Sequence, residues 1–185
     1  TGHRATHPMM VRGAAAIEQT LTSVVDIITS AISSEVGPEG ASRTRLHTLL
    51  ADGADQIAAD EALRRGWEII APLPVGADLY CAINARPANE ADAKALLTNQ
   101  QPADPEVASR AAALRKRYQS SFLFELKDAD ASMEALYFAA LASGEANAGA
   151  AFDASMSARV ALAARCSTAG VPMARRASSP CSMSA

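Results

Sequence analysis

Aromatic side chains are scarce in this sequence. Phe, Trp and Tyr together make up 4% of its 185 residues, whereas hydrophobic residues make up 49%. Much of that hydrophobic fraction is alanine, which lets helices approach closely but buries little area per residue. We therefore expect a helix-rich fold around a small sheet, in a chain long enough to bury a core of its own.

Cysteines, long apolar runs and excess charge are also lacking. Cys81, Cys166 and Cys181 are odd in number and widely spaced, which disfavours a disulfide framework or a zinc site. No run approaches the roughly 18 apolar residues of a membrane span, and the start lacks the features of a secretory signal. The net charge of −3 disfavours nucleic acid as a partner. We expect a cytoplasmic protein with no membrane contact and no metal site.

Hydrophobic periodicity predicts alternating helices and strands. Apolar residues recur at helical spacing within 14–34, at Ile17, Leu21, Val24, Ile28 and Ala31. Further helices are expected over 56–65, 90–97, 105–119, 130–143 and 150–165, and strands over 45–50, 67–71 and 122–126. The remainder of 75–104 is polar and rich in turn residues, which predicts a loop. The compact strand–helix–strand unit favours parallel strands.

Two turns that contain glycine carry the strongest functional signal. The first is Thr1–Arg4, in which Thr1, Gly2, His3 and Arg4 supply a hydroxyl, close backbone approach, an imidazole and a guanidinium. The second follows a predicted strand and contains Gly53, Ala54 and Asp55, with Asp55 expected as a helix N-cap. If both turns lie at neighbouring strand ends, backbone N–H groups and Arg4 converge on one anion. The pattern predicts a phosphate or nucleotide site.

Simpler explanations stand beside these candidates. A flexible N-terminus accounts for 1–4, and a tight turn with a helix cap accounts for 53–55. Pro74, at the exit of the next strand, is a further ligand-binding candidate that a rigid strand exit also explains. Asp52 is expected to be a solvated turn residue, and Tyr80 and Asn84 are weaker candidates for contact with a base or ribose.

The ordered set of motifs resembles the SLOG superfamily. The motifs are Thr1-Gly2-His3-Arg4, Asp52-Gly53-Ala54-Asp55, the continuation to Pro74 through Gly66-Trp67, and Leu123-Phe124-Glu125-Leu126. SLOG proteins are Rossmann-like nucleotide-binding domains related to lysine decarboxylase-like, cytokinin-activating and DNA-processing proteins. The resemblance covers residues 1–165 and implies an α/β, three-layer, Rossmann-like domain with a parallel sheet. Residues 166–185, rich in Ser, Ala, Arg and Pro, are expected to form a disordered or aberrant tail.

The resemblance also implies features that this sequence does not carry. Relatives place an apolar strand before the first turn, and a second strand with a glycine-rich GGT-type loop after the last helix. We therefore expect a fold without its first and C-terminal strands, as truncation or a shifted reading frame would produce. Asp52 stands where relatives carry a glutamate.

Three functions follow from these observations. The first is binding of a nucleotide or a nucleotide-derived phosphorylated ligand, as in a sensor. The alternative is hydrolysis of the N-glycosidic bond of nucleoside monophosphates. Relatives that catalyse it use a glutamate after the glycine-rich loop, so no catalytic residue is assigned here and no cofactor can be named. The third is a non-catalytic subunit of a homo-oligomer, paired through the alanine-rich helices 130–165.

Overall fold

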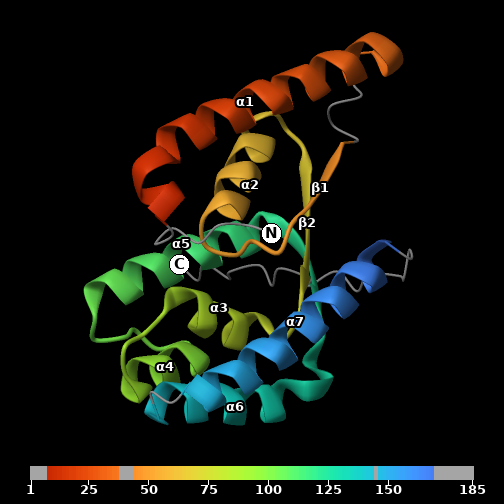
Figure 1. Cartoon of the computed structure of the whole chain (residues 1–185). Coiled ribbons are helices and arrows are strands. Elements are labelled where there is room, and N and C mark those ends of the chain that lie inside the picture. The colour runs from red at the N-terminus through yellow and green to blue at the C-terminus, as the bar shows by residue number, and fades with distance from the viewer. Residues whose placement is uncertain (1–7, 38–43, 144–145, 169–185) are drawn as a thin grey trace, which may run out of the picture.

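Three short parallel strands lie at the centre of the molecule, with helices around them (Figure 1). This computed structural model describes residues 8–37, 44–143 and 146–168. In chain order the elements are α1 (Pro8–Val36), β1 (Arg45–His47), α2 (Ala54–Arg64), β2 (Glu68–Leu73), α3 (Ala77–Ala85), α4 (Glu90–Leu97), α5 (Pro105–Gln119), β3 (Ser121–Glu125), the 3-10 turn η2 (Lys127–Ala129), α6 (Asp130–Ser143) and α7 (Ala146–Thr168). The predicted helix-rich α/β fold with a parallel sheet is confirmed.

The sheet has the order β1-β2-β3, with Leu46 opposite Ile69 and Ile70 opposite Phe122. β2 runs on through Pro72, where the sequence predicts the strand to end. A proline removes a ladder hydrogen bond, so it is tolerated only where one side of the strand needs none. The ladder between β1 and β2 ends at the pair His47 and Ile70, which leaves Pro72 beyond it.

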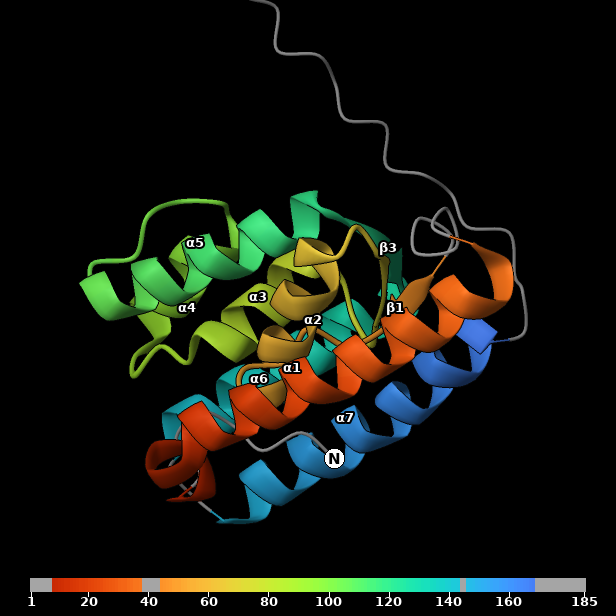
Figure 2. The same cartoon turned by 90° about the horizontal axis from the view of Figure 1, so that it is seen from above.

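Helices cover both faces of this sheet and complete three layers. α2 contacts β2 and α5 contacts β3 on one face, whereas α7 contacts β2 and β3 on the other. Figure 2 shows α3, α4 and α5 on one side of the strands and α7 on the opposite side. The largest fully buried side chains include Leu73 on β2, Leu96 on α4 and Leu114 on α5. The core therefore lies mainly between the sheet and the α3–α5 layer.

The segment after β2 corrects one prediction. Residues 77–85 form α3 rather than the start of a loop, and most of the helix is buried, including Tyr80 and Cys81. Gly76 and the prolines before it are residues typical of a loop, and α3 has only nine residues, too few for a clear helical pattern. The predicted placement of Tyr80 in a loop is therefore wrong, since Tyr80 lies in α3 and is 4% exposed.

The boundaries of the other elements follow local capping chemistry. α4 and α5 begin and end as predicted, with Asn89 and Asp104 accepting hydrogen bonds from the first backbone N–H groups. β1 is shorter than predicted: it ends at His47, and Leu50, the last residue of the predicted strand, has a left-handed φ that a strand does not allow. α7 continues to Thr168, beyond the expected domain end, and residues 169–185 of the predicted tail lie outside the described residues.

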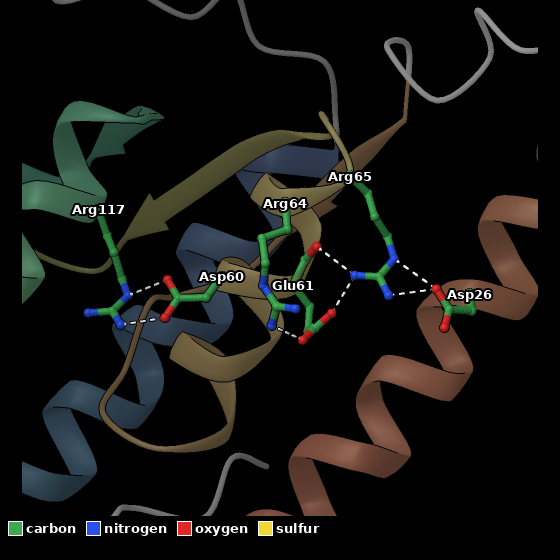
Figure 3. A network of polar contacts seen from close by, with 6 residues as sticks. All are labelled: Asp26, Asp60, Glu61, Arg64, Arg65 and Arg117. Carbon is green, nitrogen blue, oxygen red and sulfur yellow. Dashed lines mark hydrogen bonds and ion pairs between the residues drawn. The ribbon is translucent and has the colours of Figure 1, made fainter.

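Ion pairs fix α2 between α1 and α5 (Figure 3). On one side, Arg65 donates from Nε and Nη2 to Asp26 of α1, at 3.1 and 2.6 Å. On the other side, Arg117 of α5 donates to both oxygens of Asp60, at 3.0 and 2.6 Å. Between them the fully buried Glu61 carboxylate pairs with Arg64 and Arg65. The C-terminal half of α2 is thus held from two neighbouring helices.

Candidate functional site

The carboxyl ends of the strands lie at one edge of the sheet because all three strands are parallel. Each strand is followed there by a turn that leads into a helix: α2 after β1, α3 after β2, and α6 after β3. Ligands of open parallel sheets bind outside this edge. The predicted residues Gly53, Ala54, Asp55 and Pro74 all lie in two of these turns or at the first residues that follow them.

The turn after β1 has an unusual backbone. Leu50 is fully buried and has a φ of 56°, a left-handed conformation that costs a bulky residue about 1–2 kcal/mol. Its N–H donates to the Thr48 hydroxyl at 3.2 Å. Gly53 is buried with a φ of 110° and a ψ of −127°, a conformation that favours glycine. Backbone strain of this kind is concentrated at functional sites.

Asp55 lies in the first turn of α2 but does not cap it. The N-cap is Gly53, so the predicted N-cap role of Asp55 is wrong. The Asp55 carboxylate instead turns back and accepts hydrogen bonds from the Ala51 N–H and the Thr48 hydroxyl. Burial raises the pKa of this carboxyl above its ordinary value, and the two hydrogen bonds oppose that shift only in part. A half-buried carboxylate thus faces the turn.

Asp52 is held in place by α3, which corrects its prediction as a solvated turn residue. Its carboxylate forms an ion pair with Arg86, and its N–H donates to Oδ1 of Asn84 at 3.4 Å. Arg86 follows α3 as its C-cap and adopts a left-handed φ of 53°. Sequence reasoning missed Arg86, and it assigned Asn84 to a loop. No sequence signal links either residue to the turn, because the pairing arises from how α3 packs.

The turn after β2 is filled by the protein itself. Pro74 is fully buried, and the N–H groups of Gly76 and Ala77 donate to the carboxylates of Asp130 and Glu125, at 2.9 and 2.7 Å. A side chain at Gly76 would collide with Oδ2 of Asp130. The start of α3 therefore already has two anionic partners from the β3 side of the edge, and Pro74 belongs to that packed region.

Arg159 of α7 closes the turn after β3. Its guanidinium donates to the carbonyl oxygens of Pro74 and Leu126, each at 2.5 Å, and it pairs with Asp128 at 2.7 Å. The hydrogen bond from Arg159, supported by its charge, holds the pKa of the Asp128 carboxyl below its ordinary value. The Arg159 side chain is mostly buried, and its hydrogen bonds join the segment after β2 to the segment after β3.

The remaining candidates occupy different settings. The predicted turn of Thr1, Gly2, His3 and Arg4 lies outside the described residues, so its position relative to Gly53 stays a prediction. The Cys81 thiol is buried, and desolvation raises its pKa to about 11, which makes it a poor nucleophile. Within 8–37, 44–143 and 146–168, no group of three or more His, Cys, Asp or Glu side chains could hold a metal ion.

Comparison with known proteins yields no match to a protein-family model, a curated protein or a solved structure. None of the described helices has both the length and the apolar character needed to cross a bilayer. The case for a function therefore depends on the geometry of the edge. Of its three turns, the one after β1 combines a strained backbone with a half-buried carboxylate.

Proposed function

We propose that this chain binds a nucleotide or nucleotide-derived phosphorylated ligand at the turn from Thr48 to Asp55. The observation that carries the proposal is the Asp55 carboxylate, which stays partly buried beside a strained turn although burial raises its pKa. A carboxylate at the carboxyl edge of a parallel sheet is a good acceptor for ribose hydroxyl groups. The SLOG resemblance of the sequence is part of the same proposal.

The start of α2 supports a phosphate nearby. Gly53 makes no side-chain cap to the helix, whereas the starts of α4 and α5 are capped by Asn89 and Asp104. The first N–H groups of α3 are occupied by Glu125 and Asp130. α2 and α3 both follow a strand and both have a glycine N-cap, Gly53 and Gly76. Because carboxylates already occupy the first N–H groups of α3, we place the phosphate at the start of α2, where its oxygen can approach the backbone.

The ion pair between Asp52 and Arg86 supports an anionic ligand in a second way. The positive charge of Arg86 offsets the negative charge of Asp52, which reduces the repulsion between Asp52 and an approaching phosphate. In the proposal, Arg4 of the first turn supplies the further positive charge that a phosphate requires. Ribose would lie toward Asp55 and phosphate toward Gly53.

Calorimetric titration with AMP, ADP-ribose and NAD tests the proposal. We expect at least one of them to bind, and Asp55→Asn to weaken that binding by 10-fold or more, because an amide is a poorer acceptor for hydroxyl groups. The matched control is Glu106→Gln, which makes the same charge change in the first turn of α5 at an exposed position. Absence of heat with all three ligands, or equal effects of the two variants, would contradict the proposal.

A further inference from the structure

The exposed apolar residues of this molecule are concentrated on one helix. Among the described residues, five large hydrophobic side chains are exposed: Val24, Ile27, Ile28 and Val36 on α1, and Leu162 on α7. Single exposed apolar residues are ordinary, but several on one helix mark an interaction surface. The 29-residue α1 packs on the body of the molecule chiefly through α2.

The spacing of these residues is that of a helix–helix seam. Ile17, Leu21, Val24, Ile28 and Ala31 follow one another at alternating intervals of four and three residues, the pattern of a coiled-coil stripe. A stripe with this spacing is ordinarily the buried side of a helix. The structure instead directs Val25 into the core and leaves Val24 and Ile28 exposed, by 46% and 40%. The stripe thus borders α2 but faces outward.

Segments of the same chain offer little to cover this face. Residues 1–7, 38–43 and 144–145 contain no Leu, Ile, Val, Phe or Met, and 169–185 contain only Val171, Met173 and Met183 of these types. Such a supply of apolar side chains falls far short of what the stripe exposes. These segments are therefore poor candidates to cover it.

The charge pattern of the stripe favours a second copy of this chain as its partner. Between Gln19 and Ser34 the only charged residue is Asp26, and its carboxylate is engaged by Arg65. A charged partner would find no complement on this face, whereas two copies can meet without repulsion between like charges. In an antiparallel contact about a two-fold axis, Val24 faces Ile28 and Leu21 faces Ala31, which sets larger side chains against smaller ones.

We infer that α1 is a dimerisation helix, which pairs with α1 of a second copy of this chain along the stripe from Leu21 to Ala31. This surface differs from helices 130–165, for which the sequence predicts a role in oligomers. α6 and α7 pack on each other in the structure. The inference does not depend on the proposed ligand site.

Sedimentation equilibrium of the full chain, at concentrations up to about 1 mM, tests this inference, since a Kd of 1 mM corresponds to about −4 kcal/mol. We expect a mass that approaches twice that of the chain as concentration rises. Val24→Glu and Ile27→Glu should each shift the equilibrium toward monomer by 10-fold or more. The control is Ser30→Glu, on the polar side of α1, which should leave the dissociation constant within a factor of two.

Helical content and the unfolding midpoint of each variant show whether it is folded, and Ile27→Glu is the safer test because Ile27 is 69% exposed. A monomeric mass of the original chain throughout the range would overturn the inference. So would a dimer that persists in both folded glutamate variants, since the contact would then lie elsewhere.

Discussion

At the scale of single residues, Asp55 stands in surroundings that oppose its charge. Its pKa is raised by burial in the folded protein, so the folded state binds a proton more readily than the unfolded state does. Above the ordinary value of 3.8 the ionised carboxylate therefore favours unfolding. A residue that costs stability at neutral pH is one that a function would explain.

Asp55→Asn should therefore separate stability from binding. At pH 7 we expect an unchanged or higher unfolding midpoint, because the amide removes the buried charge and still accepts the Ala51 N–H. Urea denaturation measures the stability and calorimetry measures the binding. A large loss of stability at pH 7 would show that the carboxylate serves the fold rather than a ligand.

Gly76 is a position where a carboxylate packs directly against the backbone. The Asp130 carboxylate accepts the Gly76 N–H and lies where a Cβ would be. Hydrogen bonds to a charged group contribute roughly 1.5–3 kcal/mol, so displacing Asp130 is costly.

Gly76→Ala should lower the free energy of unfolding by about 2 kcal/mol, because Asp130 must move and lose that hydrogen bond. In an Asp130→Ala background the same substitution should cost markedly less, since no carboxylate oxygen remains to collide with the methyl group. Denaturant unfolding of the four proteins in this cycle measures the coupling. Strictly additive effects would mean that the Gly76 backbone itself resists substitution.

At the scale of elements, α1 is joined to the rest of the molecule by a buried charge. Glu61 is fully buried on α2, and its pairs with Arg64 and Arg65 and a hydrogen bond from Thr22 together lower its pKa in spite of desolvation. Arg65 extends the contact to Asp26 of α1. Removal of one partner of a buried ion pair leaves the other uncompensated.

Glu61→Gln should destabilise the protein by about 3 kcal/mol, because Arg65 loses half of its charge balance in a buried position. The matched control is Glu68→Gln, which removes the exposed pair with Arg45 and should cost less than about 1 kcal/mol. Hydrogen exchange should locate the main increase in α1 and α2. Equal costs for the two variants would exclude a special role of the buried pair.

The elements also show what a sequence can reveal. α4 and α5 were predictable to the residue, because Asn89 and Asp104 cap them and Pro105 begins the second of them. α3 was not, because its surroundings are rich in glycine and proline and its helical pattern is short. Local chemistry marks ends well, whereas it cannot report that a short apolar segment finds a place in the core.

In the candidate site, too, the sequence indicated the local turn but not the contacts that depend on packing. The turn around Gly53 and Asp55 was visible in the sequence as a glycine between a strand and a helix. Its contacts with Arg86 and Asn84 were not visible, since they depend on the packing of α3 across more than thirty residues of chain. The left-handed conformation of Leu50 was equally hidden, because leucine is not a residue that predicts it.

At the scale of the whole molecule, carboxylates with lowered pKa values set the response to acid. Glu61, Asp92 and Asp128 all have folded-state pKa values below their ordinary ones, owing to arginine partners or hydrogen bonds. Their contribution to stability is fully present above the unfolded pKa and disappears as the pH falls through the folded pKa. Asp55 has the opposite sign.

The free energy of unfolding should therefore change little from pH 7 to about pH 5 and fall steeply below pH 4.5, the ordinary pKa of a glutamate. Urea denaturation between pH 7 and pH 3 measures this profile. Glu61→Gln should flatten the acid limb. A stability that increases as the pH falls from 5 to 3 would contradict the assignment of these carboxylates.

The contacts of Arg159 can form only late in translation, because this residue lies near the end of the described part of the chain. The carbonyl oxygens it holds belong to Pro74 and Leu126, 85 and 33 positions earlier in the chain. Until residue 159 has emerged from the ribosome, a nascent chain lacks the hydrogen bonds that Arg159 donates to these two carbonyl oxygens. Ribosome-bound chains stalled before that point should be cut by a protease near these strand ends, and chains stalled well after it should resist.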